Sequence, residues 1–161
     1  MSNNLNRYER LDMLFEKYSN LLYRIALVKL RSREDAEDAV QDAFIKYLSS
    51  PFNFFSDSEE KAWLVKVLEN RCHDLLRRRN VREYIPIEEI YDLASDDEVS
   101  AGVFEMLTHI SEKYRTVILL HHLEGFSIDE ISKALSLSPS AVKMRLSRGR
   151  EELKKLIGEG E

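Results

Sequence analysis

The fold is decided near the C-terminus, where residues 127–150 run SIDEISKALSLSPSAVKMRLSRGR. Ser127, with Glu130 three positions later, has the spacing of a capping box and predicts a short helix. A two-residue turn follows, after which Ser138 caps a second helix that has Pro139 at its first position. Two helices joined by a tight turn are typical of the helix-turn-helix motif, although a plain helical hairpin would show the same pattern.

The second helix of this motif has an apolar face and a polar face. Helical spacing assigns its buried stripe to Val142, Leu146, Gly149, Leu153 and Leu156. The N-terminal half of such a helix enters the major groove of DNA, and its outward side chains here are Ser140, Lys143, Met144 and Ser147. Three flanking arginines can reach phosphates, namely Arg145, Arg148 and Arg150. These seven residues are the predicted contacts with duplex DNA.

The composition of the whole chain also favours an all-α protein. Its 161 residues leave room for one ordinary domain or two small ones, and 5 Gly with 3 Pro are few for a sheet protein. Before the motif, one helix is expected after Ser95 and another over residues 111–124, closed by Gly125. No apolar run has the length of a transmembrane helix, so membrane insertion is not expected. Cys72 is the only cysteine, which excludes an internal disulfide and favours the reducing cytoplasm.

Acidic residues are concentrated in the middle of the chain. The formal net charge is -5 overall, but residues 81–104 alone carry 1 basic and 7 acidic side chains, a net charge of -6. Helical periodicity also fades in this segment. We therefore predict two small helical domains, 1–80 and 105–161, joined by an acidic linker, 81–104. A protein of this charge must bind DNA through a local surface or with the help of a partner.

The first domain opens with two amphipathic helices. The first is expected to bury, at helical spacing, Leu11, Leu14, Phe15, Tyr18, Leu22 and Ile25. Ser32 with Asp35 resembles a capping box that starts the second helix, whose buried stripe is expected to be Ala36, Ala39, Val40, Ala43 and Tyr47. The opposite side is a compact acidic face of Glu34, Glu37, Asp38, Gln41 and Asp42. This face is either a solvated helix surface or a docking surface.

A third helix, over about residues 60–79, carries a continuous polar stripe. At one-turn intervals the stripe consists of Lys66, Asn70, His73 and Arg77, and it ends in Arg78 and Arg79. Trp63 lies one turn before it, and the preceding loop contains Phe52, Phe54 and Phe55. Cations bind phosphates and aromatic rings stack on unpaired bases, so this set suits single-stranded nucleic acid. Arginines at a helix C-terminus also suit the helix dipole, and Trp63 can equally be a core residue.

These motifs together resemble the extracytoplasmic-function (ECF) sigma factors of bacterial RNA polymerase, almost from end to end. Residues 37–44 (EDAVQDAF) resemble the polymerase-binding helix of region 2. Residues 62–64 (AWL), Asn70 and residues 74–78 (DLLRR) resemble the helix that meets the minus-ten promoter element. Region 4 is matched by residues 113–117 (KYRTV), 124–131 (EGFSIDEI) and 141–150 (AVKMRLSRGR). Each motif alone is only moderately specific, but their order on either side of a linker is very specific.

The resemblance implies a division of labour between two DNA elements. Binding of core RNA polymerase falls to Glu37, Asp38, Gln41 and Asp42. Melting of the minus-ten element and capture of its unpaired non-template strand fall to Phe54, Phe55, Trp63, Lys66, Asn70, His73, Arg77 and Arg78. Recognition of the minus-thirty-five element as duplex falls to Ser140, Lys143, Met144, Arg145, Ser147, Arg148 and Arg150. An anti-sigma factor is a further implied partner, whereas no catalytic residue, cofactor or metal is expected.

The sequence departs from the family pattern at several positions. Glu60 stands where an aromatic residue often precedes the tryptophan by three positions, so Phe54 or Phe55 would fill that place from the loop. Ala141 and Met144 stand where small hydroxyl residues are frequent, which should change base preference. The resemblance also implies that the linker lies along the polymerase channels that hold nucleic acid. Because such channels must be basic, the acidic linker is expected to take the place of nucleic acid there, with the charges supplied by Glu88, Glu89, Asp92, Asp96 and Asp97.

Two other classes of protein remain as alternatives at this point. A one-component transcriptional regulator would use residues 1–80 to bind a ligand or to dimerise, and it would bind duplex DNA alone. An enzyme would have to rely on Cys72-His73 or His121-His122. Adjacent residues on a helix point about 100° apart, so neither pair easily binds one metal or forms a nucleophile and its base. Transcription by core polymerase with and without the added protein would separate the three classes.

Overall fold

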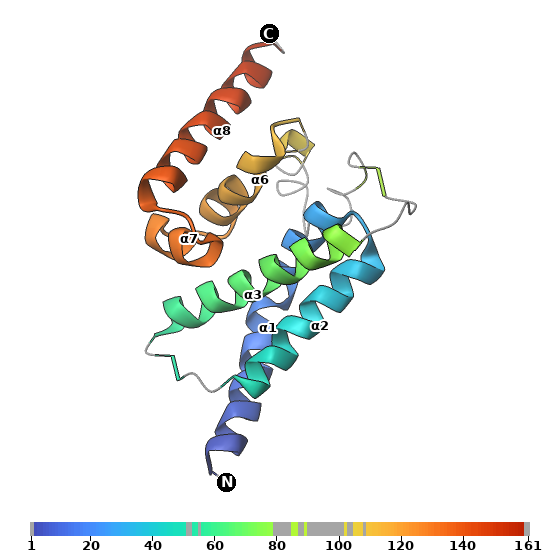
Figure 1. The fold of residues 1–161 in the computed structure, drawn as a ribbon. Helices are drawn as coiled ribbons and strands as arrows, with labels where there is room; N and C mark the ends of the chain where they lie inside the picture. Colours follow the sequence, from blue (N-terminus) through green and yellow to red (C-terminus); the bar gives the residue numbers. More distant parts are fainter. Residues whose placement is uncertain are drawn as a thin grey trace. The chain divides into compact units, whose positions relative to one another are not determined.

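The computed structural model describes residues 2–50, 53–54, 56–78, 85–86, 89, 102, 105–107 and 109–159, with the backbone alone for residues 2–5 and 159. The regular secondary structure of these residues is entirely helical, which confirms the expected all-α class (Figure 1). The chain divides into two compact units, Met1–Tyr84 and Ile85–Glu161. Most of the acidic segment 81–104, with four of its five carboxylates assigned to polymerase channels, lies outside the described residues.

The first unit is built from α1 (Ser2–Leu30), α2 (Arg33–Ser49) and α3 (Asp57–Arg78). Each of these helices packs against the other two. Arg31, with a left-handed φ of 53°, turns the chain from α1 into α2. Ser32 then caps α2, since its side-chain oxygen accepts a hydrogen bond of 3.3 Å from the backbone N–H of Asp35.

The small-residue stripe predicted on α2 is buried in full, from Ala36 to Tyr47. On α1 the prediction is correct for Leu14, Tyr18, Leu22 and Ile25, which are buried, and wrong for Phe15, which is 51% exposed. Phe15 follows the buried Leu14 by one position, or about 100° around the helix, which carries it to the edge of the packed face. There its ring lies 5.2 Å from that of Phe44.

Helix α3 begins earlier than the sequence indicated. It starts at Asp57, because the side-chain oxygen of Ser56 accepts a hydrogen bond of 3.2 Å from the N–H of Glu59 and so caps the first turn. Its buried face includes Leu64, Leu68 and the fully buried Cys72. Leu76, expected to be available for the core, is instead exposed, so the core contacts weaken toward the end of the helix.

The second unit contains α6 (Glu112–Ile118), the π-helical turn η1 (Leu119–Leu123), α7 (Ile128–Leu135) and α8 (Pro139–Glu159). The single helix expected over residues 111–124 is thus an α-helix that continues as a π-helix. Gly125 ends it with a φ of 71°, a conformation that favours glycine. Both α6 and α7 pack on α8.

The helix-turn-helix motif has the predicted caps. The Ser127 hydroxyl accepts from the Glu130 N–H at 3.1 Å, and the Glu130 carboxylate accepts from the Ser127 N–H at 2.9 Å, which forms a complete capping box. Ser136 makes the turn in the left-handed conformation, with a φ of 55°. Ser138 caps α8 by accepting a hydrogen bond of 3.1 Å from the Ala141 N–H.

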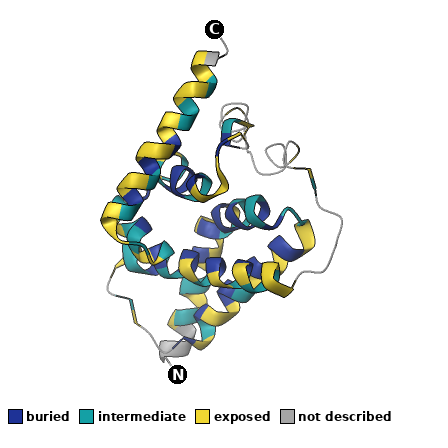
Figure 2. Cartoon of the chain, turned by 45° about the horizontal axis from the view of Figure 1, so that its top comes forward, coloured by how far each residue is buried: buried dark blue, intermediate teal, exposed yellow. Residues whose placement is uncertain are grey.

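The buried stripe of α8 is strongest in its first half. Val142, Leu146 and Gly149 are buried, whereas Leu153 and Leu156 are half-buried. In Figure 2 the inner faces of the helices within each unit carry the buried residues, and the outer face of α8 is exposed along most of its length. Helix α8 therefore uses its N-terminal half for packing and leaves a long outer surface open.

Candidate functional site

The acidic face predicted on α2 is exposed, but it is not a set of isolated carboxylates. Glu37, Asp38 and Gln41 are exposed and Asp42 is half-buried. Arg71 of α3 reaches across to this face and pairs with two of its members. Its Nη2 donates to Oδ2 of Asp38 at 3.1 Å, and its Nε lies 2.6 Å from Oδ2 of Asp42.

This pairing stabilises the positive charge of Arg71. Burial of the Arg71 side chain by itself would lower the pKa of its guanidinium, but the hydrogen bond to Asp38 and the charge of Asp42 outweigh it and raise the pKa. Arg71 consequently stays charged and fixes the rotamers of both carboxylates. It also cancels one of the negative charges that the α2 face would otherwise present to a partner.

The polar stripe of α3 faces solvent as predicted. Lys66, Asn70, His73, Arg77 and Arg78 are all exposed. Arg77 is paired with Asp74 in the same helix, and its hydrogen bond lowers the pKa of the Asp74 carboxyl. Nε2 of His73 lies 3.9 Å from Oε2 of the buried Glu69. The stripe thus combines exposed cations with an amide and an imidazole along one helix face.

An aromatic cluster stands at the beginning of this stripe. Trp63 is half-buried, and the rings of Phe54 and Trp63 lie 5.5 Å apart. Tyr47, buried at the end of α2, stacks on Phe54 at 6.0 Å and meets the edge of Trp63 at 6.1 Å. Phe54 therefore lies against Trp63 from the loop, in accordance with one of the two alternatives drawn from the sequence. Phe55 lies outside the described residues.

The outward face of α8 carries the predicted DNA-binding side chains. Ser140, Lys143, Met144, Ser147, Arg148 and Arg150 are exposed. Arg145 is half-buried, with Nη1 3.5 Å from the backbone oxygen of Lys113. Arg150 donates from Nε to Nε2 of His122 at 3.1 Å. Burial, Arg150 and His121 together lower the pKa of His122, so a neutral His122 can accept this bond at neutral pH.

Comparison with known proteins follows the division into two units. Residues 14–82 match the protein family described as "Sigma-70 region 2", and residues 102–153 match the family described as "Sigma-70, region 4". The chain is 30% identical over 150 residues to the ECF RNA polymerase sigma factor SigM of Mycobacterium tuberculosis, a match that covers 91% of this chain and 76% of that protein. The chain belongs to the ECF RNA polymerase sigma factors of the sigma-70 family.

This sigma factor is also similar to two further proteins. It is 28% identical over 161 residues to the ECF RNA polymerase sigma factor SigX of Bacillus subtilis, with 91% of this chain and 83% of that protein covered. A solved structure described as CnrH in complex with the cytosolic domain of CnrY superimposes with a TM-score of 0.66 and 25% identity. That match covers 96% of this chain and 91% of the other.

Membership of the family settles the class of activity. The protein is a sigma factor that directs transcription initiation by RNA polymerase, and sigma factors are non-catalytic subunits, so the regulator and enzyme alternatives are set aside. Among the described residues no helix is long and apolar enough to cross a membrane, and no group of three potential metal ligands was found. The roles of the individual residues on α2, α3 and α8 stay predictions.

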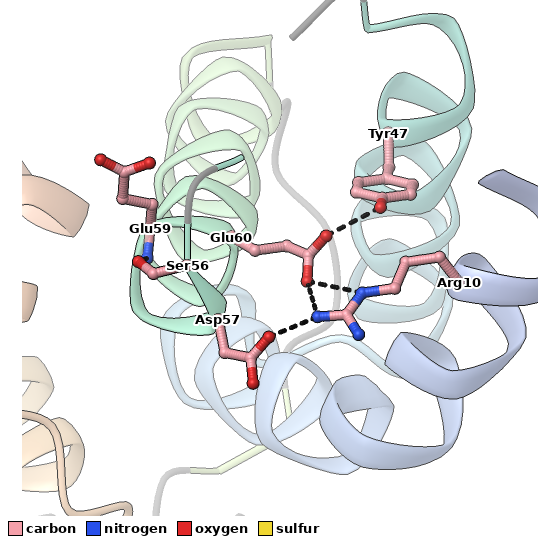
Figure 3. A network of polar contacts seen from close by, with 6 residues as sticks. All are labelled: Arg10, Tyr47, Ser56, Asp57, Glu59 and Glu60. Carbon is pink, nitrogen blue, oxygen red and sulfur yellow. Dashed lines mark hydrogen bonds and ion pairs between the residues drawn. The ribbon is translucent and has the colours of Figure 1, made fainter. Parts of the chain in front are cut away.

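Three residues of this sigma factor were not expected to contribute to its functional faces. The sequence gives no role to Arg71, although it pairs with the acidic face of α2. It gives none to Arg10 either and marks Glu60 only as a departure from the family pattern, yet these two residues meet in one hydrogen-bonded network (Figure 3). One feature of the sequence does indicate the role of Glu60. It precedes Leu64 by one helical turn, so this charged residue stands at a position where a buried side chain is expected.

Proposed function

We propose that this sigma factor binds core RNA polymerase through the acidic face of α2, formed by Glu37, Asp38, Gln41 and Asp42. Glu37, Asp38 and Gln41 are exposed and open to a partner, and Arg71 pairs with Asp38 and with the half-buried Asp42, which restricts their rotamers. Carboxylates held in advance lose less side-chain entropy when a basic surface binds them. The face lies on a helix packed on both α1 and α3 and is therefore rigidly supported.

The minus-ten element is melted and held by α3 and the loop before it. The arrangement that most strongly supports this role is the aromatic cluster at the beginning of an exposed cationic stripe. Phe54 and Trp63 offer rings near solvent, and Asn70 and Arg77 lie two and four turns beyond Trp63 on the same helix. Unpaired bases can stack on the rings while the cations bind the phosphates that follow.

The minus-thirty-five element is recognised as duplex by α8. Lys143, Met144 and Ser147 face outward in the half of the helix that follows the Ser138 cap, which is the half that enters a major groove. The exposed Arg148 and Arg150 are suited to phosphates. Met144 offers an apolar contact rather than a hydrogen bond, so this helix should favour thymine methyl groups at the position it meets.

The remaining partners and the location follow from the same function. Core polymerase and the chromosome place the working protein in the cytoplasm. An anti-sigma factor is a suitable regulator, because the structural relative CnrH was solved in complex with the cytosolic domain of CnrY. The acidic segment 81–104 serves as a linker that occupies basic polymerase channels until the transcript displaces it.

The polymerase-binding role is tested with two charge-reversal pairs of equal spacing. The double variant Asp38→Lys/Asp42→Lys should lose binding to core polymerase in a pull-down or anisotropy assay. Asp12→Lys/Glu16→Lys on α1 reverses two exposed carboxylates at the same spacing and should bind as the wild type does. If both double variants bind core polymerase as the wild type does, polymerase binds elsewhere on the protein. Circular dichroism of each variant confirms that the helices are intact.

A further inference from the structure

A buried carboxylate joins all three helices of the first unit. Glu60, in the first turn of α3, is only 4% exposed. Its Oε1 accepts from Nε of Arg10 at 3.0 Å and from Nη2 of Arg10 at 2.6 Å, while its Oε2 accepts from the Tyr47 hydroxyl at 2.8 Å (Figure 3). Both oxygens are therefore satisfied by donors from other helices, which a buried charge requires.

The cation of this network, Arg10, has a second carboxylate partner. Nη2 of Arg10 contacts Oδ1 of Asp57 at 2.5 Å, so Arg10 bridges two carboxylates one turn apart on α3. Hydrogen bonds to Glu60 and Asp57 raise the pKa of the Arg10 guanidinium, and it remains charged. Burial, followed by the bond to Glu60, raises the pKa of Tyr47 to about 12, so its hydroxyl remains a donor at neutral pH.

The same tyrosine is the base of the aromatic cluster. The Tyr47 ring stacks nearly parallel on Phe54, with an angle of 11° between the planes, and meets Trp63 at 69°. The guanidinium carbon of Arg7 also lies over the Tyr47 ring, 5.7 Å from its centroid. Trp63 itself follows Glu60 by one turn of α3. The Tyr47 ring thus supports both half-buried aromatic rings of the cluster, Phe54 and Trp63.

We propose that Glu60, Arg10 and Tyr47 form a polar lock that positions Phe54 and Trp63 for the capture of unpaired promoter bases. The proposal rests on the minus-ten role assigned above to this aromatic cluster. Glu60 occupies a position where the family often has an aromatic residue. In this protein a buried hydrogen-bonded carboxylate therefore replaces an apolar packing contact, and the aromatic ring is supplied by Phe54.

The polar lock should fix the positions of the aromatic rings as well as stabilise the fold. Without the bond to Glu60, the Tyr47 ring can rotate and shift, and Phe54 follows because it stacks on that ring. A stacking platform that must first be ordered binds bases more weakly than one held in place. The lock should consequently affect the opening of the promoter and leave binding of duplex DNA and of core polymerase unchanged, since none of its hydrogen bonds involves a residue assigned to those two steps.

The main comparison of the test is between three variants of the full chain in reconstituted holoenzyme. Tyr47→Phe removes only the hydroxyl, Glu60→Gln removes only the charge, and Glu59→Gln is the matched control. Glu59 lies in the same turn, and its side chain points away from Arg10 and Tyr47 (Figure 3). Stopped-flow fluorescence of 2-aminopurine in the minus-ten element gives the opening rate, and competition with unlabelled duplex promoter gives closed-complex affinity.

The lock predicts that opening slows by about tenfold in Tyr47→Phe and Glu60→Gln, with closed-complex and core polymerase affinities within about twofold of wild type. Glu59→Gln should open at the wild-type rate. The double variant Arg10→Gln/Glu60→Gln should open the promoter no more slowly than the slower of its two single variants, because both substitutions act through one network. If Glu60→Gln fails to fold, the milder Tyr47→Phe decides the outcome.

The outcomes separate the lock from the role on which it rests. Wild-type opening rates in Tyr47→Phe and Glu60→Gln, beside slow opening in Trp63→Ala, would overturn the lock alone. Wild-type opening in Trp63→Ala would overturn the minus-ten role of the cluster itself. A proportional loss of opening, duplex affinity and polymerase affinity in the lock variants would show that the network serves stability only, which also contradicts the proposal.

Discussion

Arg71 of α3 places its Nε 2.6 Å from Oδ2 of Asp42, a member of the α2 face assigned to polymerase. Asp38 on the preceding turn of α2 pairs with the same guanidinium at 3.1 Å. Two carboxylates that would attract a basic partner are therefore already neutralised in part by a residue of the protein itself. Binding of polymerase has to share these carboxylates with Arg71 or displace it.

The first prediction is that Arg71→Gln speeds association with core polymerase. Removing one positive charge beside Asp38 and Asp42 strengthens the attraction to a basic surface, and rates of association respond to such charges at low salt. We expect an increase of about twofold to threefold at low ionic strength that disappears at high salt. Stability should fall by about 1 kcal/mol or less, since the pair is partly exposed.

Stopped-flow anisotropy at two salt concentrations measures this effect. Lys17→Gln, which removes an exposed positive charge from α1, is the matched control and should change the rate much less. Slower association of Arg71→Gln at low salt would contradict the prediction, and would indicate that Arg71 contributes directly to the interface.

The second prediction concerns the contact between α6 and α8. A methyl group at Gly149 would lie 3.0 Å from Cγ1 of Ile118 and 3.2 Å from Cβ of Tyr114, so the two helices approach closely at this glycine. Gly149→Val should overpack the contact and destabilise the second unit by about 1–3 kcal/mol. It should also weaken binding to the minus-thirty-five duplex, because the recognition half of α8 lies next to the disturbed contact.

A second glycine of the same helix provides the control for this experiment. A Cβ atom at Gly158 would meet nothing within 4 Å, so Gly158→Val should leave stability unchanged or raise it slightly. Chemical denaturation of both variants measures the difference. Equal stabilities of Gly149→Val and Gly158→Val would mean that α6 and α8 are not packed as closely as described.

The third prediction is that Cys72 reacts very slowly in the native protein. Burial raises the pKa of its thiol from 9.0 to about 12, which lowers the fraction of reactive thiolate at pH 8 by roughly a thousandfold. Burial also blocks access, since Cys72 is fully buried in the core of the first unit. Reaction with a thiol reagent should be complete within minutes in denaturant and barely detectable without it. Fast labelling of the native protein would contradict the packing of α3.

Local patterns in the sequence predicted much of this fold. The capping box of Ser127 and Glu130 and the small-residue stripe of α2 depend on residues within one or two turns, and both are confirmed. Phe15 was placed wrongly because helical spacing gives the direction of a side chain and not the width of the neighbouring helix that would cover it. The π-helical turn η1 has the same composition as an ordinary helix and left no signal.

The side-chain contacts that organise the candidate sites could not be predicted from the sequence, for a different reason. Arg10 and Glu60 are 50 positions apart, and Arg71 and Asp38 are 33 positions apart. Their pairing depends on the register of whole helices, which a single sequence does not specify. The exposure of the acidic face of α2, of the α3 stripe and of the outward face of α8 did follow from periodicity, because exposure is a property of one helix.

The fourth prediction separates the functions proposed for the two units. Asn70→Ala on α3 should impair opening of the minus-ten element, whereas Lys143→Ala on α8 should impair recognition of the minus-thirty-five duplex. A promoter with a premelted bubble already provides the unpaired strand, so it should restore much of the activity of Asn70→Ala and none of that of Lys143→Ala. Lys17→Ala serves as the charge control for Lys143→Ala and should behave as wild type on both templates.

Permanganate footprinting of the non-template strand in holoenzyme, on ordinary and premelted promoters, tests the central claim most directly. The account predicts that Asn70→Ala leaves minus-ten thymines unreactive on the ordinary promoter, and that on the premelted promoter transcript yield returns to near the wild-type level. Lys143→Ala should stay defective in transcription on both templates. Rescue of Lys143→Ala by the bubble, with a persistent defect in Asn70→Ala, would contradict the division of function between α3 and α8.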